Sequence, residues 1–218
     1  MKVGILFDLD GTLLDTLQDL TSSVNYALAQ YGLPPRTCEQ VRQAIGSGAR
    51  LLIARSLPEN SEESFIDEVL ATYQAHYKAN SQVATAPYPG VLDALEELKA
   101  QFPIGIVSNK PDAPTKALCA DFFPGIYARG ESTDCVRKPA PDMLLKTMEL
   151  LGVERCIYVG DSDVDVITAK NTGVPCLSVL WGFRDEAEIR KNGGEYFCHD
   201  PKDLAQTLKN MVKEIYGQ

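Results

Sequence analysis

The sequence predicts an α/β fold, a doubly wound parallel sheet with an inserted all-helical unit. Three observations predict it. The first apolar run, Val3–Phe7, has no polar residue, as expected of a parallel strand that helices cover on both faces. Residues 16–84 then show helical periodicity and no pattern typical of a strand. From residue 85 onward, short apolar runs alternate with helical patterns, which is the element order of such a sheet.

The first strand leads directly into the segment from Asp8 to Thr12, in which a glycine lets the backbone turn. Apolar residues at helical spacing begin near Leu17, and Asp15 and Asp19 are expected to cap and begin that helix. The periodicity predicts further helices in the inserted unit, so that its helices lie at residues 17–31, 38–45, 49–57 and 64–77.

Prolines and a glycine at residues 87–90 end the inserted unit, and strands then alternate with helices. The later strands are predicted at residues 104–107, 126–128, 156–159, 176–180 and 196–198. The later helices are predicted at residues 91–102, 114–122, 141–151, 164–171, 186–191 and 204–216. The sequence therefore divides into a core of residues 1–15 and 85–218 and a helical unit of residues 16–84.

The composition is that of an ordinary globular protein of 218 residues, with 44% hydrophobic and 23% charged residues. A net charge of -9 argues against nucleic-acid binding and against adhesion to anionic membranes. An anionic substrate stays possible, because a divalent cation and a few lysines reverse the local field. No apolar stretch approaches the roughly 18 residues of a membrane span, and no secretory signal is expected. The six cysteines form no close pair, which argues against a zinc or redox motif and favours a reducing cytoplasm.

Polar residues follow several of the predicted strands and give the strongest functional signal. The carboxyl ends of parallel strands meet at one edge of a sheet, where ligand sites lie, so we expect acids, hydroxyls and a lysine to converge there. The candidate residues are Asp8, Asp10, Thr12, Ser108, Asn109, Lys110, Lys138, Asp161 and Asp165. Taken singly, Thr12 and Ser108 fit capping or turn roles better, and Lys138 fits a solvated lysine, the usual case for its type.

The order of these residues resembles that of the haloacid dehalogenase (HAD) superfamily, in its phosphatase branch. The family's first motif, Asp-x-Asp-x-Thr, is matched by residues 8–12, and its second, a serine or threonine, by Ser108. Its lysine is matched by Lys138, and its Gly-Asp-x-x-x-Asp motif by residues 160–165. The resemblance spans the chain and implies a Rossmann-like HAD core with a helical cap of the first type.

The resemblance also implies a role for each residue in the hydrolysis of a phosphate ester. Asp8 would be the nucleophile that forms a phosphoaspartyl intermediate, and Asp10 would act as acid and base. Mg²⁺ would be held by Asp8, Asp161 and the backbone carbonyl of Asp10. Asp165 would orient Lys138 or a metal-bound water. The phosphoryl group would be bound by Thr12, Ser108, Asn109 and Lys138.

Residues 108–111 (Ser-Asn-Lys-Pro) and 181–183 (Trp-Gly-Phe) are similar to segments of phosphoglycolate phosphatases. The resemblance therefore implies a small phosphorylated metabolite as substrate, first of all 2-phosphoglycolate. Gly46 and Gly48 would form a loop that closes over the site, and Arg50 would pair with a substrate carboxylate. The alternative is a plain helix–helix turn with a solvated Arg50.

The sequence leaves other functions open. Relatives with the same cap act on other small phosphomonoesters or on pyrophosphate, so a broad-specificity phosphatase or a pyrophosphatase is an alternative. A non-catalytic binding module that kept the fold is an alternative of a different class, and the presence of Asp8, Asp10, Lys138 and Asp161 counts against it. A monomer or homodimer in the cytoplasm is expected, without nucleic-acid or membrane partners.

Overall fold

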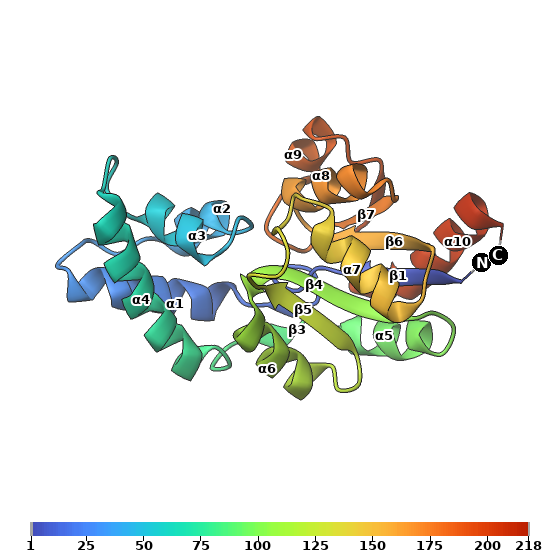
Figure 1. The fold of residues 1–218 in the computed structure, drawn as a ribbon, viewed down its shortest axis with the longest axis horizontal. Coiled ribbons are helices and arrows are strands. Elements are labelled where there is room, and N and C mark those ends of the chain that lie inside the picture. Colours follow the sequence, from blue (N-terminus) through green and yellow to red (C-terminus); the bar gives the residue numbers. More distant parts are fainter. Residues whose placement is uncertain (1, 218) are drawn as a thin grey trace.

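The computed structural model describes residues 2–217 and contains a six-stranded parallel sheet flanked by helices (Figure 1). The strands follow the order β5-β4-β1-β6-β7-β8 across the sheet. They are β1 Val3–Phe7, β4 Ile104–Pro111, β5 Tyr127–Glu131, β6 Arg155–Gly160, β7 Cys176–Val179 and β8 Tyr196–Cys198. Every neighbouring pair is parallel, so the predicted sheet is confirmed.

Helices cover both faces of this sheet. The helices of the core are α5 Val91–Lys99, α6 Asp112–Phe122, α7 Asp142–Leu151, α8 Asp163–Thr172, α9 Glu186–Lys191 and α10 Leu204–Tyr216. Buried residues of α5, α6 and α10 share one cluster with Ile5 and Phe7, whereas those of α7 and α8 share another with Leu6. Because successive residues of a strand point to opposite faces, β1 faces apolar cores on both sides and carries no polar side chain.

The interior position of β1 determines where the residues after it lie. Phe7 pairs with Ile106 of β4 on one side and with Val159 of β6 on the other. The amide of Asp8 continues this pairing and donates to the carbonyl of Val159 at 2.8 Å. Asp8 therefore leaves the sheet between β4 and β6, at the edge where the polar ends of those strands also lie.

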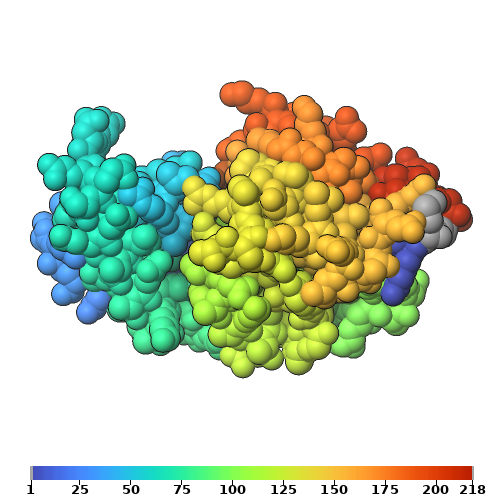
Figure 2. Space-filling view, in the orientation of Figure 1, coloured from blue at the N-terminus to red at the C-terminus, as the bar shows by residue number. Residues whose placement is uncertain are grey.

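Four helices precede the rest of the core and form a unit with its own hydrophobic cluster. These cap helices are α1 Leu17–Gln30, α2 Cys38–Ala44, α3 Ala49–Ser56 and α4 Glu63–Asn80. Their cluster includes Val24, Val41 and Val69, together with Phe183 from the core. In the space-filling view, the cap helices form a lobe at one end of the molecule (Figure 2). Phe183 thus joins the two hydrophobic units.

The two linkers between the cap helices and the core pair with each other. β2 Leu14–Asp15 runs antiparallel to β3 Ala86–Pro87, with Leu14 opposite Pro87. Strands of two residues show no periodicity, so the sequence pattern does not predict them. The linkers are therefore the two sides of one short ribbon.

β4 also differs from its prediction. The apolar pattern ends at residue 107, whereas β4 continues to Pro111 with a shift of register against β5. Ser108, Asn109 and Lys110 are buried within this extended end. Polar residues are uncommon in buried strands, which is why the pattern ends too early.

Asp19 does not cap the first helix. Its buried carboxylate accepts hydrogen bonds of 2.8–3.0 Å from the amides of Val83, Ala84 and Thr85 and from the Thr85 hydroxyl. Asp19 lies in the first turn of α1, as expected, but the prediction that it caps the helix is wrong, because the linker that returns to the core supplies its donors. Asp15 acts locally, as expected, and accepts from the amide of Leu17 at 3.2 Å.

The cysteines are free thiols, and no helix within residues 2–217 has the length and apolar character needed to cross a membrane. Burial raises the pKa of Cys119 and of Cys156 to about 12. Thiols with such pKa values are scarcely ionised at neutral pH and react slowly. Cys156 therefore behaves as a small buried hydrophobe.

Replacing Asp19 by alanine should loosen the attachment of the returning linker. The variant leaves the amides of residues 83–85 without their acceptor, so the free energy of unfolding should fall by about 3 kcal/mol. Urea unfolding followed by circular dichroism measures this change. Asp15→Ala is the matched control, because it removes one exposed bond and should cost less than about 1 kcal/mol. Equal losses in the two variants would contradict the role given to Asp19.

Candidate active site

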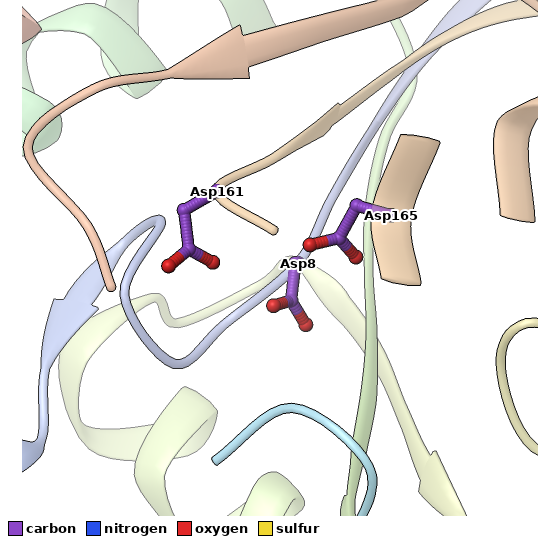
Figure 3. A group of neighbouring side chains, drawn as sticks. All are labelled: Asp8, Asp161 and Asp165. Carbon is purple, nitrogen blue, oxygen red and sulfur yellow. The ribbon is translucent and has the colours of Figure 1, made fainter. Parts of the chain in front are cut away.

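Three carboxylates face one another where β1 and β6 end (Figure 3). Asp8 follows β1, Asp161 follows β6, and Asp165 lies in the first turn of α8. One oxygen atom from each lies within 4.8 Å of the other two, and all three side chains are buried. The structure thus brings together three of the residues that the sequence pattern selects.

Lys138 supplies the positive charge at the centre of this group. Its Nζ lies 2.8 Å from Asp8 Oδ1, from Asp165 Oδ1 and from the Tyr158 hydroxyl. An ammonium group has three protons, so these acceptors use all of its donors. Burial opposes the charge, but the carboxylates of Asp165 and Asp8 outweigh this effect and raise the pKa of Lys138 above its ordinary value. The lysine is therefore charged and fixed in position.

Asp165 binds Lys138 and does not itself border the cavity described below. Its Oδ1 accepts from Lys138 and also from the Tyr158 hydroxyl at 2.9 Å, while Oδ2 accepts from the Ser162 hydroxyl at 2.6 Å and the Ser162 amide at 3.2 Å. Burial raises the pKa of Tyr158 well above its ordinary value, so the phenol stays protonated and can donate. Both oxygens of Asp165 are occupied by protein donors, which agrees with the orienting role expected of this residue.

Asp161 is held by two other segments of the core. Its Oδ2 accepts from the amide of Phe183 at 2.6 Å, and its Oδ1 accepts from the Thr12 hydroxyl at 3.3 Å. Glycines permit this close approach: Gly11 has φ of +84°, and a Cβ there would lie 2.3 Å from Asp161 Oδ2. A Cβ on Gly182 would lie 2.3 Å from Asp161 Cβ. Thr12, expected at the phosphoryl group, contacts Asp161 and does not border the cavity described below.

The carboxylates of Asp8, Asp161 and Asp165, called the carboxylate group below, together fit a divalent cation. Burial, followed by the charges of Asp165 and Asp8, raises the pKa of Asp161 well above its ordinary value, and burial raises the pKa of Asp8 to about 7. A hard cation that prefers oxygen ligands, such as Mg²⁺, would favour the ionised forms of both. Asp8 and Asp161 are the members of the group that border the cavity and are able to hold it.

The carboxylate of Asp10 faces a second lysine. Lys110 Nζ lies 3.1 Å from Asp10 Oδ1, as an ion pair that is not aligned as a hydrogen bond. The same Nζ donates to the hydroxyl of Tyr77 at 2.8 Å. Tyr77 belongs to α4, so this contact joins a cap helix to β4 directly beside Asp10.

Ser108 and Asn109 lie in the extended end of β4. Ser108 Oγ accepts from the amide of Lys110 at 3.2 Å and borders the cavity. The Asn109 side chain bonds to both the amide and the carbonyl of Lys138, each at 2.9 Å, and donates to the carbonyl of Gly46 at 3.1 Å. Asn109 therefore positions Lys138 and reaches the cap; it also borders the cavity, and the phosphoryl-binding role that the resemblance implies for it stays a prediction.

The structure does not bring Arg50 to the site. Its guanidinium pairs with Glu63 and, at 3.0 Å, with Asp67, two exposed acids of α4. Gly46 and Gly48 border the cavity, but Arg50 does not. The expected contact between Arg50 and a substrate carboxylate therefore finds no support, because acids of its own unit neutralise the side chain.

A cavity of about 540 Å³ lies between the cap helices and the core. Its core side carries the polar groups Asp8, Asp10, Ser108, Lys110, Lys138 and Asp161. Its cap side includes apolar and aromatic residues, among them Leu20, Ile45, Tyr73 and Tyr77. A pocket of this size and character is suited to a small polar molecule.

The family model for haloacid dehalogenase-like hydrolases matches residues 5–179, which include the carboxylate group and Lys138. The chain belongs to this family. It is 37% identical over 211 residues to a protein of Pseudomonas aeruginosa named phosphoglycolate phosphatase 1, a match that covers 92% of this chain and 77% of that protein. It is 32% identical to the phosphoglycolate phosphatase of Aquifex aeolicus, over 97% of this chain and 99% of that one.

A solved structure gives the same assignment. The crystal structure of a suggested phosphoglycolate phosphatase from Lactobacillus delbrueckii subsp. bulgaricus matches this hydrolase with a TM-score of 0.89 and 33% identity. The match covers 94% of this chain and 97% of that chain. The chain is thus a phosphatase of the haloacid dehalogenase-like family, as its motif order implied.

Three residues of this hydrolase's site are absent from the predicted set. Tyr158 is the one phenol within an otherwise apolar strand, which is a weak signal in the sequence. Tyr77 is indistinguishable from the other aromatic residues of α4, and Phe183 belongs to a segment whose contacts the pattern does not reveal. Their roles arise from contacts with residues far away in the chain.

Mg²⁺ should stabilise this hydrolase more at alkaline than at acidic pH. Asp8 has a pKa of about 7 in the metal-free folded state against 3.8 as its ordinary value, so the folded state retains a proton that the unfolded state releases. Metal-free protein therefore loses stability as the pH rises from about 4 to about 7. Metal binding needs the ionised carboxylate and should restore stability above that range.

Thermal melts with Mg²⁺ or with EDTA across this pH range measure the effect. Asp8→Asn is the control, since it removes one of the two carboxylates whose pKa is raised and should weaken the metal-free pH dependence, to which Asp161 still contributes. A Mg²⁺-induced shift in melting temperature that is the same at every pH would contradict the prediction.

Proposed function

We propose that this phosphatase hydrolyses 2-phosphoglycolate, with Mg²⁺ as cofactor and Asp8 as nucleophile. The position of the Asp8 carboxylate supports this proposal most directly. It borders the cavity, and its Oδ1 is held 2.8 Å from Lys138 Nζ. A carboxylate oriented in this way is suited to attack phosphorus and to form a phosphoaspartyl intermediate. The relatives named phosphoglycolate phosphatase support the choice of substrate.

The phosphoryl group would be bound beside Asp8. Lys138 and Ser108 border the cavity there: Ser108 offers a hydroxyl donor to phosphoryl oxygens, and Lys138 places its positive charge beside them. Mg²⁺, held by Asp8, Asp161 and the backbone carbonyl of Asp10, would neutralise part of the phosphoryl charge. Because Asn109 and Asp165 both bind Lys138, its ammonium keeps its position while the phosphoryl group moves from substrate to enzyme.

Asp10 would transfer the protons of both half-reactions. It borders the cavity two residues after Asp8, and its ion pair with Lys110 holds its carboxyl group beside the nucleophile. In the first half-reaction it protonates the ester oxygen, and glycolate leaves. In the second it removes a proton from the water that attacks the phosphoaspartyl group, which releases phosphate, regenerates Asp8 and restores the proton that Asp10 donates in the next turnover.

The cap helices would close the site during the reaction. Contacts cross between cap and core at the cavity, among them those from Asn109 to Gly46, from Lys110 to Tyr77 and from Arg184 to Ile45. Closure excludes bulk water from the phosphoryl group, and opening along the paired linkers would admit substrate. We also keep the cytoplasmic location and the monomeric or homodimeric state as proposals.

Asp8→Asn should reduce kcat for 2-phosphoglycolate by at least roughly 1,000-fold, because the amide is a poor nucleophile. Phosphate release in the presence of Mg²⁺ measures turnover, and circular dichroism confirms that the variant is folded. Asp93→Asn makes the same chemical change on an exposed face of α5 and should retain full activity. A folded Asp8→Asn variant with normal turnover would overturn the nucleophile assignment.

The same phosphate-release assay, run with several substrates, tests the preference for 2-phosphoglycolate. Catalytic efficiency for 2-phosphoglycolate should exceed that for p-nitrophenyl phosphate and for other small phosphomonoesters. Equal efficiencies across such a panel would favour a broad-specificity phosphatase. Turnover confined to pyrophosphate would favour a pyrophosphatase.

Arg50→Ala should leave the KM for 2-phosphoglycolate unchanged within about twofold, since exposed ion pairs contribute little and the side chain lies outside the cavity. Steady-state kinetics with 2-phosphoglycolate and with p-nitrophenyl phosphate check this. A rise in KM for 2-phosphoglycolate alone would show that Arg50 reaches the substrate after all.

A further inference from the structure

We propose that Lys110 and Tyr77 form the subsite that binds the carboxylate of the substrate. This inference rests on the proposed function and assigns the recognition of the leaving group to two residues. Lys110 comes from β4 of the core and Tyr77 from α4 of the cap, and both border the cavity. The subsite therefore exists only where cap and core meet.

The position of the Lys110 ammonium is well defined. It is buried, with 7% of the residue exposed, and its Nζ donates to the Tyr77 hydroxyl at 2.8 Å. The same Nζ lies 4.5 Å from the centre of the Tyr77 ring. Asp10 Oδ1 lies 3.1 Å away. These contacts fix the charge at one place in the cavity wall.

Lys110 has donors to spare. An ammonium group offers three protons, and within residues 2–217 its one hydrogen bond goes to Tyr77. The contact with Asp10 is an ion pair without hydrogen-bond alignment. A buried cation with unused donors on a cavity wall is suited to bind an anion. The Tyr77 hydroxyl accepts from Lys110 and can donate its own proton to the same anion.

The other cations at the cavity have partners or positions that exclude them from this role. Lys138 spends its three protons on Asp8, Asp165 and Tyr158. Arg184 spends its terminal guanidinium donors on backbone carbonyls at the end of α2. Lys78 is exposed to solvent. Within the described chain, Lys110 is thus the buried cation at this cavity that remains available.

The chemistry of the substrate matches this position. In 2-phosphoglycolate, one methylene separates the ester oxygen from the carboxylate. Asp10 protonates that ester oxygen under the proposed mechanism, so the carboxylate lies within reach of groups adjacent to Asp10. Lys110 is such a group. Substrate preference would then depend on the Lys110 ammonium beside Asp10 rather than on Arg50, which lies on the outer surface of the cap.

The test compares two esters that differ at one group. 2-Phosphoglycolate carries the carboxylate, and 2-hydroxyethyl phosphate carries a neutral hydroxymethyl group in its place. The variants are Lys110→Met and Tyr77→Phe, with Lys78→Met as the control that removes one exposed lysine from the same cavity. We compare kcat/KM for each ester with Mg²⁺ present, after circular dichroism has confirmed folding.

Lys110→Met should lower kcat/KM for 2-phosphoglycolate by about 10- to 100-fold more than for 2-hydroxyethyl phosphate. Tyr77→Phe alone should lower the ratio of kcat/KM for 2-phosphoglycolate to kcat/KM for 2-hydroxyethyl phosphate by about 3- to 10-fold. Lys78→Met should change this ratio less than about twofold. Equal losses for both esters in Lys110→Met would overturn the inference, because Lys110 would then act through Asp10 alone.

Other outcomes also decide the question. A change of ratio in Lys78→Met as large as that in Lys110→Met would overturn the inference. If Lys110→Met does not fold, Tyr77→Phe decides, and an unchanged ratio there would overturn it. A wild-type enzyme that hydrolyses neither ester would reject the proposed function itself, whereas the other negative outcomes leave wild-type turnover intact.

Discussion

The ammonium group of Lys138 is the interaction on which the rest of the site depends. It lies among Asp8, Asp165 and Tyr158 with almost no access to solvent. Removing one partner from such a buried set leaves a charge uncompensated, at a cost of about 3–5 kcal/mol. The chain accordingly holds Lys138 by its backbone as well, through both polar groups of the Asn109 side chain. Stability and reactivity therefore depend on the same side chain.

Close backbone packing around the carboxylates follows from the same constraint. Gly160 precedes Asp161, and a Cβ at that position would lie 2.3 Å from Asp165 Cβ. Gly11 and Gly182 approach Asp161 equally closely. The backbone thus packs directly against the carboxylates and restricts their rotation. Groups fixed in this way need little reorganisation when charge shifts during a reaction.

The sequence predicted what local pattern and topology determine. The strand ends are visible as apolar runs followed by Asp8, Ser108 or Asp161, and a parallel sheet brings such ends together. Side-chain contacts that involve the inserted helices were not predictable. The pairing of Lys110 with Tyr77 depends on how α4 docks, and the pattern around Arg50 cannot reveal acids 13 and 17 residues later that neutralise it.

The contacts of residues 183 and 184 make the cap helices specific to this core. Arg184 donates to the carbonyls of Arg42 and Ile45 at 2.9 and 2.8 Å, at the end of α2 where the helix dipole favours a cation. Phe183 lies in the hydrophobic cluster of the cap while its amide holds Asp161. The linkers mark where the chain enters and leaves the cap, but Phe183 and Arg184, which contact the cap helices, lie outside the segment between them. An engineer who exchanges residues 16–84 for the helices of a relative must therefore transplant the segment 181–184 with them, because the incoming helices were fitted to another loop.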